Sequence, residues 1–403
     1  MLQALPLVFV LIGVTLYTVL AGADFGAGLW QLLAGPGERG ERIREHAHHS
    51  MAPVWEANHV WLIFVLTVLW TAYPRVLGSI ASTLAVALSA AALGIIFRGA
   101  AYALREGAAS DREAGVIDTI FAVSSIITPF ALGAAVGAIA TDRVPVGNAA
   151  GRLFSSWLNG PSVLIGVLAV ASCAYLAAVY LAADAARLGD DQLQQAFRRR
   201  ALGAGAAAGA LALAGVVVLE TNYHRLYHSL VAGSGLPALV VSALAGVATL
   251  GLVWRHRYEW ARYSAALAVA AIVAGWALAR WPVILPGLTV QQAAAGHDTL
   301  VWVVVAVLVG GLILFPSLGL LFRLSLTGRF RATEKADTGL GAAAIGLGTG
   351  SWPVRVAVAC LVSGFGLLNV ADADWAHGLG VVCLLGFVVI GFRAVIVNAL
   401  ADG

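Results

Sequence analysis

The densest group of side chains able to carry chemistry lies in the stretch MAPVWEANHVW, residues 51–61. Glu56 and His59 are three residues apart, so on a helix they share one face. An acid beside an imidazole can take up protons and pass them on near neutral pH. With Asn58 and two tryptophans around one acid, the turn is unusually polar for an apolar segment, and it predicts a proton pathway through Glu56, His59 and Asn58. The alternative is that Glu56 only caps a helix N-terminus, where negative charge is favourable.

A second acid, Asp24, lies in an apolar segment, within the sequence GADFGAG of residues 22–28. If the first two apolar segments form a helical hairpin, Asp24 and Glu56 lie at similar depth near the same end. The glycines of this stretch favour close helix approach. The two carboxylates therefore predict a proton-conducting pair. The alternative is a packing hairpin that contains one hydrogen-bonded acid.

Arg98 and Asp118 lie at adjoining ends of two further apolar segments. Ionisable groups within a membrane helix cost about 2.5–3.5 kcal/mol each on insertion scales, so a partner of opposite charge is expected. We predict a structural ion pair between Arg98 and Asp118 that closes this hairpin.

Metal and haem ligation on this chain are not predicted. His46, His48 and His49 follow Glu45 in a hydrophilic segment beside arginines, which favours a solvated or headgroup-facing loop. His224 and His228 have a metal-compatible i, i+4 spacing but no third ligand in the sequence nearby. The three cysteines are isolated from one another, and a set of inward-facing axial haem ligands is lacking.

The elements that position these residues follow from composition. Of the 403 residues, 60% are hydrophobic and 11% charged, and the mean hydropathy is +0.88. A soluble domain is roughly 45–50% apolar and about 25% charged. Soluble enzymes, disordered chains and fibrous repeats are therefore excluded. With a net charge of +3 spread over the chain, nucleic acid is not an expected partner.

Apolar runs of about 20 residues are long enough to cross a bilayer, and none alternates with the period of a barrel strand. The sequence therefore predicts an all-α polytopic membrane protein with about eleven transmembrane helices. The predicted segments are 4–33, 52–73, 77–104, 116–140, 160–184, 201–220, 235–254, 262–284, 297–325, 354–371 and 376–400.

Charge asymmetry predicts the orientation, because cytoplasmic loops are enriched in Lys and Arg. Of the 24 basic residues, 18 lie after odd-numbered segments or at the C-terminal end, and 5 lie after even-numbered ones. The N-terminus is thus expected outside and the C-terminus inside. A Gly- and Ala-rich linker at 332–353 is expected to separate a nine-helix body, 1–331, from a C-terminal helical hairpin, 354–403.

Two other classes of protein also place acids in membrane helices. A proton-coupled secondary transporter is one alternative, although transporters tend to show broken helices at corresponding positions of two repeats. Here the acids cluster in the first half of the chain. A purely structural membrane subunit, whose acids merely cap helices, is the other alternative.

Residues 52–62 (APVWEANHVWL) resemble a motif of subunit II of cytochrome bd-type quinol oxidases, (G/A)P-x-W-D-G-N-x-V-W-L. The GADFGAG stretch is similar to that family's G-x-D-x-G-x-G, and the resemblance covers about residues 1–330. It implies a nine-helix subunit of two four-helix bundles plus one helix. It also implies that Glu56 and Asp24 stand at acids of a cytoplasmic proton route, and that Trp61, with Trp55, lines a proton or oxygen channel.

The resemblance further implies the setting of the chain, the cytoplasmic (inner) membrane of a prokaryote. There it would pair with subunit I, which holds haem b and haem d, or haem b only, and carries the quinol site. The complex would oxidise quinol and reduce dioxygen to water; this subunit would bind no haem itself. A structural quinone or lipid and small single-helix accessory subunits are further expected partners.

Two departures from the family pattern stand out. Glu56-Ala57 replaces the usual Asp-Gly, which moves the carboxylate out by about one methylene. The terminal helix pair extends beyond the family's usual end. One role open to it is to cover a surface that a small accessory subunit covers elsewhere in the family.

Overall fold

The computed structural model describes residues 1–51, 55–105, 110–326, 352–370 and 374–401. Its elements are α1 (Leu5–Leu32), α2 (Glu38–Met51), α3 (Trp55–Ala72), α4 (Pro74–Thr83), α5 (Ala85–Arg105), α6 (Asp111–Ala140), α7 (Gly160–Leu188), α8 (Asp191–Asn222), α9 (His224–Val231), α10 (Leu236–Trp254), α11 (Tyr258–Arg280), β1 (Val283–Leu285), β2 (Leu288–Thr289), α12 (Val290–Ala293), α13 (His297–Leu326), α15 (Trp352–Val370) and α16 (Asp374–Ala401). Each of the eleven predicted apolar segments is helical over most of its described residues. The predicted linker at 332–353 lies almost wholly outside the described residues.

Eight of the described helices are long and apolar enough to cross a membrane, namely α1, α5, α6, α7, α8, α10, α11 and the first part of α13. Shorter apolar stretches lie in α3, α15 and α16. The all-α fold class is thus confirmed. Two compact units divide the chain, residues 1–310 and 311–403.

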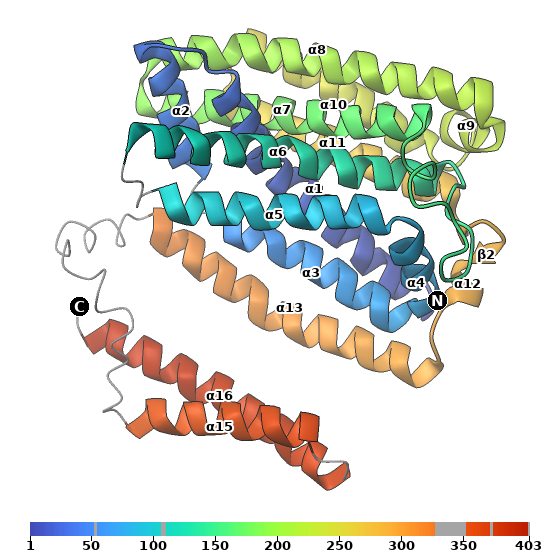
Figure 1. The fold of residues 1–403 in the computed structure, drawn as a ribbon, viewed down its shortest axis with the longest axis vertical. Helices are drawn as coiled ribbons and strands as arrows, with labels where there is room; N and C mark the ends of the chain where they lie inside the picture. The colour runs from blue at the N-terminus through green and yellow to red at the C-terminus, as the bar shows by residue number, and fades with distance from the viewer. Residues whose placement is uncertain (52–54, 106–109, 327–351, 371–373, 402–403) are drawn as a thin grey trace. The chain divides into compact units, whose positions relative to one another are not determined.

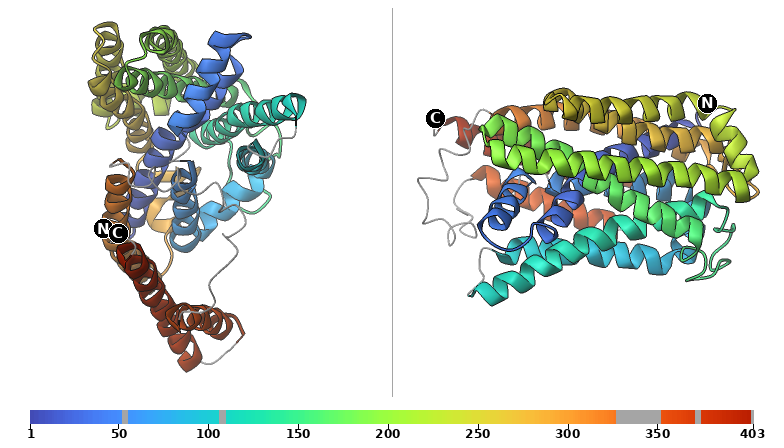
Figure 2. Two further views of the ribbon diagram at one scale, coloured as in Figure 1. Left: turned by 90° about the vertical axis from the view of Figure 1, so that its left-hand side faces the viewer. Right: turned by 90° about the horizontal axis from the view of Figure 1, so that it is seen from above.

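Within residues 1–310 the long helices lie side by side, and α1 lies inside the bundle (Figures 1 and 2). It contacts α2, α3, α6, α7 and α11. In its second half, every residue from Ala21 to Gly28 is buried, and most of these residues are glycine or alanine. Two apolar cores meet at α1: one formed with α2, α7, α8 and α11, the other with α3 to α6, β1, β2, α12 and α13.

Close packing around α1 depends on its glycines, as the sequence indicated. A Cβ at Gly26 would overlap the backbone carbonyl of Cys173 on α7. One at Gly28 would overlap the side chain of Ser125 on α6. At these two glycines the approaching neighbours are α6 and α7, whereas α3 approaches α1 at Gly13, where a Cβ would lie 2.8 Å from Cγ2 of Val65.

The predicted helix 77–104 is divided in two at Leu84. Two hydroxyl groups of α4 bind the connection before α7. Ser79 accepts a hydrogen bond from the Gly147 backbone, and Ser82 accepts one from Ala149. With ten residues, α4 spans only about 15 Å, too short to cross the hydrocarbon core.

The predicted helix 262–284 ends at Arg280, four residues early, because Pro282 cannot continue a helix. A short antiparallel pair follows, with Leu285 opposite Leu288. Pro286 and Gly287 form the turn between them, and Gly287 adopts a φ of +73°, which glycine tolerates.

The second unit contains a helical hairpin in which α15 packs against α16. A Cβ at Gly364 would lie 2.8 Å from Cγ of Leu384 and 2.9 Å from the carbonyl oxygen of Gly380. These small residues let the two helices approach closely, which agrees with the predicted C-terminal helix pair.

Candidate functional site

The centre of the site is an ion pair between Asp24 on α1 and Arg98 on α5, whose side chains are 3% and 4% exposed. Nη1 of Arg98 donates to Oδ2 of Asp24 over 2.5 Å, and Nη2 donates to Oδ1 over 2.7 Å. Nη2 also donates to the Asp24 backbone carbonyl over 3.1 Å. Such two-pronged contacts are the strongest geometry for this pair of side chains.

Helix α6 completes the enclosure of the guanidinium. Nε of Arg98 donates to Oγ of Ser125 over 2.9 Å, and that hydroxyl donates in turn to the Phe121 carbonyl. The rings of Phe121 and Phe25 flank the guanidinium, with centroids 4.5 and 5.0 Å from Cζ. The ion pair therefore joins three helices, with its donors and acceptors paired and its faces covered by aromatic rings.

The pair lies well inside the bundle. Asp24 is eight residues before the end of α1, and Arg98 is seven before the end of α5. At 1.5 Å per residue, both lie about 10–12 Å along their helices from that end.

The predicted ion pair between Arg98 and Asp118 is wrong. Arg98 pairs with Asp24. Asp118 instead accepts a 2.6 Å hydrogen bond from Nε of Arg105, the last residue of α5. Both partners of this second pair are about 40% exposed. The error has a physical reason: Arg98 is two turns before the end of α5 and points into the bundle, where Asp24 is the acid within reach.

Of the motif at the start of α3, the structure places some side chains and not others. Glu56 and Trp55 belong to the first turn of α3, but their side chains lie outside the described part of the chain. Asn58 is 1% exposed, and within the described residues its amide nitrogen and oxygen have no hydrogen-bond partner. An unpartnered buried amide is costly, so this site suits water or another polar occupant.

His59 and Trp61 extend the motif toward α1. The His59 ring meets Tyr17 and Phe25 edge-to-face, with centroids 6.1 and 6.3 Å apart. Trp61 packs against the small cluster of Tyr17, Ala21, Phe25 and Cys173. Helix α3 therefore brings its motif residues against the same stretch of α1 that carries Asp24.

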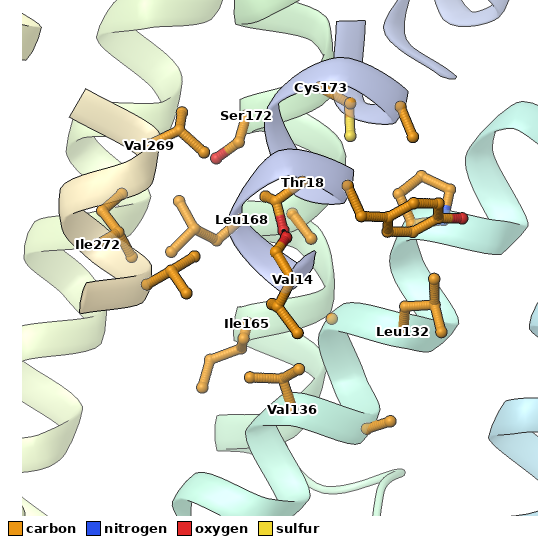
Figure 3. Close-up of a pocket in the computed structure, with 18 of the residues that line it drawn as sticks. Val14, Thr18, Leu132, Val136, Ile165, Leu168, Ser172, Cys173, Val269 and Ile272 are labelled. Carbon is orange, nitrogen blue, oxygen red and sulfur yellow. Dashed lines mark hydrogen bonds between the residues drawn. The ribbon is translucent and has the colours of Figure 1, made fainter. Parts of the chain in front are cut away.

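A cavity of about 320 Å³ lies beside this cluster, between α1, α6, α7 and α11 (Figure 3). Its wall is apolar, with residues such as Leu132, Ile165 and Ile272. Tyr17 also lines it, and the Tyr17 hydroxyl is buried without a hydrogen-bond partner among the described residues. The cavity can thus hold small apolar molecules, with a few polar groups, among them those of Thr18, Ser172 and Trp276, in its wall.

The first connection differs from the predicted solvated loop. Residues 38–51 form the helix α2, because Ile43, His46 and Ala47 share one face and are buried. Nε2 of His46 lies 3.1 Å from the Leu181 carbonyl, and its ring packs on Phe197. The spacing of Ile43 and Ala47 was the sequence signal for this helix.

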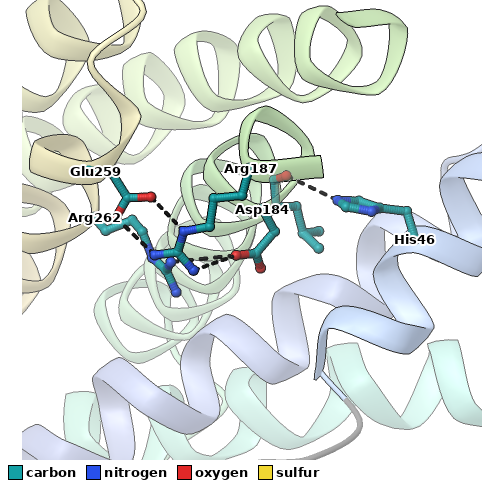
Figure 4. Close-up of polar contacts among 6 residues, drawn as sticks. His46, Asp184, Arg187, Glu259 and Arg262 are labelled. Carbon is teal, nitrogen blue, oxygen red and sulfur yellow. Dashed lines mark hydrogen bonds and ion pairs between the residues drawn. The ribbon is translucent and has the colours of Figure 1, made fainter. Parts of the chain in front are cut away.

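Beside His46, charged residues join α7 to α11 (Figure 4). Arg187 donates to both oxygens of Glu259 over 2.7 and 2.8 Å, and also reaches Asp184. Arg262 lies 3.5 Å from the same oxygen of Asp184. These pairs fasten one end of the bundle. Over the described residues, no three His, Cys, Asp or Glu side chains are grouped to hold a metal ion.

The structural pattern is that of an all-α, multi-pass membrane protein organised around one enclosed ion pair. A family model described as cytochrome bd terminal oxidase subunit II matches residues 2–325. The chain belongs to that family. The match ends within α13 and leaves α15 and α16 outside it.

Individual relatives agree with the family. Cytochrome bd-I ubiquinol oxidase subunit 2 of Escherichia coli (strain K12) is 29% identical over 131 residues, 32% of this chain and 34% of the relative. Cytochrome bd ubiquinol oxidase subunit 2 of Bacillus subtilis (strain 168) is 28% identical over 127 residues, 31% of this chain and 37% of the relative. The chain thus spans about a third of the length of the curated relatives it matches.

Similarity in three dimensions extends further. A solved structure of bd oxidase from Geobacillus thermodenitrificans includes a chain that matches with a TM-score of 0.63 and 25% identity. The match covers 81% of this chain and 99% of that one.

Proposed function

We propose that the chain is subunit II of a bd-type terminal oxidase, a complex that oxidises quinol and reduces dioxygen to water. The family match over residues 2–325 carries this proposal. The haems, b and d or b only, and the quinol site belong to the partner, subunit I.

The proposed contribution of this subunit is a proton route that enters from the cytoplasm at Glu56. It continues past His59 and Asn58 toward Asp24. The amide of Asn58 is buried without a hydrogen-bond partner among the described residues, and it supports the route because such a site can hold water. Asp24 contributes as a fixed charge: both its oxygens are held by Arg98.

Oxygen access is a second proposed role, with Trp55 and Trp61 lining the region. The apolar cavity beside α1 supports it, since its apolar wall suits small apolar molecules, and Trp61 packs on the cluster of Tyr17, which lines the cavity. The proposed setting is the cytoplasmic membrane of a prokaryote, with the N-terminus outside and the C-terminus inside. A structural quinone or lipid and small accessory subunits complete the proposed assembly.

Substitution of Glu56 tests the proton route. In the intact complex, Glu56→Gln is expected to lower quinol oxidase turnover at least about tenfold, because the amide cannot release a proton. Haem content and subunit composition, read from optical spectra and gels, are expected to stay unchanged.

The matched control is Glu38→Gln, which removes an exposed acid from α2 and is expected to keep full turnover. Normal turnover in Glu56→Gln would refute the proton role. A purified complex without haem bands and without a second large membrane subunit would refute the oxidase assignment itself.

A further inference from the structure

The arginines at the α2 end of the bundle fall into two groups, those with an acidic partner and those without one among the described residues. Arg42 pairs with Asp190, and Arg187 pairs with Glu259. Arg39 on α2 and Arg200 on α8 form no ion pair within the part of the chain that the structure describes. Helix α2 packs on the start of α8, because Ile43, one turn after Arg39, shares a buried cluster with Phe197, and Arg42 pairs with Asp190. This packing brings Arg39 near Arg200, and the two positive charges repel each other.

Arg200 is held in place by aromatic residues. Its Cζ lies 5.6 Å from the centroid of Trp30 and 5.5 Å from that of Phe197. Nη1 donates to the Ala196 carbonyl over 3.3 Å, which uses one of its five N–H groups. The remaining donors are available to a ligand.

The aromatic support is itself rigid. Nε1 of Trp30 donates to the Ala174 carbonyl on α7 over 2.8 Å. Phe197 is fully buried and packs against His46. A half-buried cation fixed on this platform beside a second cation costs energy unless an anion neutralises both.

The surroundings indicate which anion fits. Leu32 and Leu33, two and three residues after Trp30, are 46% and 56% exposed, so exposed apolar side chains follow the aromatic platform along the chain. Guanidinium groups bind phosphate oxygens in a two-pronged geometry. Anionic lipids of the cytoplasmic leaflet present a phosphate beside acyl chains, and each nearby basic residue attracts them.

We infer that Arg39 and Arg200, with Trp30 beneath Arg200, form a binding site for a phosphate-bearing anion, supplied by an anionic phospholipid. This site lies outside the ion pair of Asp24 and Arg98 and does not depend on the proposed oxidase function. The competing explanation is that both arginines only complement the carboxyl-terminal end of the α1 dipole.

The test measures lipid binding to the purified, full-length complex by native mass spectrometry. Wild type is compared with Arg39→Gln, Arg200→Gln and the control Arg199→Gln, which removes an exposed arginine next to the site. The probes are phosphatidylglycerol, phosphatidylcholine and inorganic phosphate. Arg39 is exposed, so its variant keeps the test valid even if Arg200→Gln fails to fold.

The expected result is that phosphatidylglycerol binds about tenfold more weakly to Arg39→Gln and Arg200→Gln than to wild type and Arg199→Gln. Phosphatidylcholine should bind all four proteins alike, and inorganic phosphate should not displace the lipid. Displacement by inorganic phosphate at similar concentration would refute the lipid as the source. Equal phosphatidylglycerol binding by all four proteins, or equal loss in Arg199→Gln, would refute the site and favour the dipole explanation.

Discussion

At the scale of single residues, Arg98 holds the site together through hydrogen bonds and contacts with aromatic rings. It binds Asp24 at three oxygens and Ser125 at one, and two phenyl rings cover it. A charge enclosed in this way is stable only while its partner remains. Asp24 and Arg98 are therefore expected to behave as one unit, and loss of either should leave the other as an unpaired buried charge.

This coupling predicts a double-mutant result. Asp24→Leu and Arg98→Met are each expected to destabilise the protein by about 3–5 kcal/mol, because each leaves an uncompensated charge. The double variant is expected to be more stable than either single variant. Thermal unfolding of the purified complex measures all three.

The matched control is the exposed pair of Arg105 and Asp118, whose side chains are about 40% exposed. Asp118→Asn is expected to cost less than about 1 kcal/mol, as surface ion pairs generally do. Purely additive costs for Asp24→Leu and Arg98→Met would show that the two residues do not act as a unit.

At the scale of helices, the close approach of α1 to α6 places Ser125 against Arg98. Gly28 permits this approach, because any Cβ there would overlap Ser125. The ion pair is therefore sensitive to a residue that does not touch it.

Gly28→Ala is expected to destabilise the complex by about 1–3 kcal/mol, the usual cost of overpacking a tight interface. The control is Gly203→Ala on α8, where an added Cβ meets nothing within 4 Å. It should be neutral or stabilising by up to about 1 kcal/mol, because alanine favours helix. Thermal midpoints of the two variants compare directly, and equal midpoints would contradict the role assigned to Gly28.

The helices themselves were predictable, and the contacts between them were not. Apolar length alone located all eleven segments, since it is a local property of the sequence. Asp24 and Arg98 are 74 residues apart, and no local spacing relates them. The break at Leu84 and the helix α2 were not predicted, because both segments were judged by their average hydropathy. An average does not register a short polar pattern, as in α4, or an amphipathic one, as in α2.

At the scale of the whole molecule, the orientation remains a prediction from the distribution of basic residues. Single cysteines at Arg112 and Asn148, in connections predicted to lie on opposite sides, test it. With native cysteines replaced, a membrane-impermeant maleimide added to whole cells is expected to label Asn148→Cys and not Arg112→Cys. The reverse pattern would invert the topology and move the entry of the proposed proton route to the outer face.

The enclosed position of Asp24 has a consequence for the order in which the protein is made. Helix α1 leaves the ribosome first, and Arg98 follows 74 residues later. At roughly 5–20 residues per second, the acid waits several seconds for its counterion. During this interval α1 must enter the bilayer with an unpaired carboxyl group, at a cost of about 2.5–3.5 kcal/mol that its many apolar residues offset. Synthesis of α5 then supplies Arg98 and completes the pair. A pause in translation before α5 is therefore expected to leave a nascent chain with an unpaired Asp24, which membrane quality-control proteases recognise.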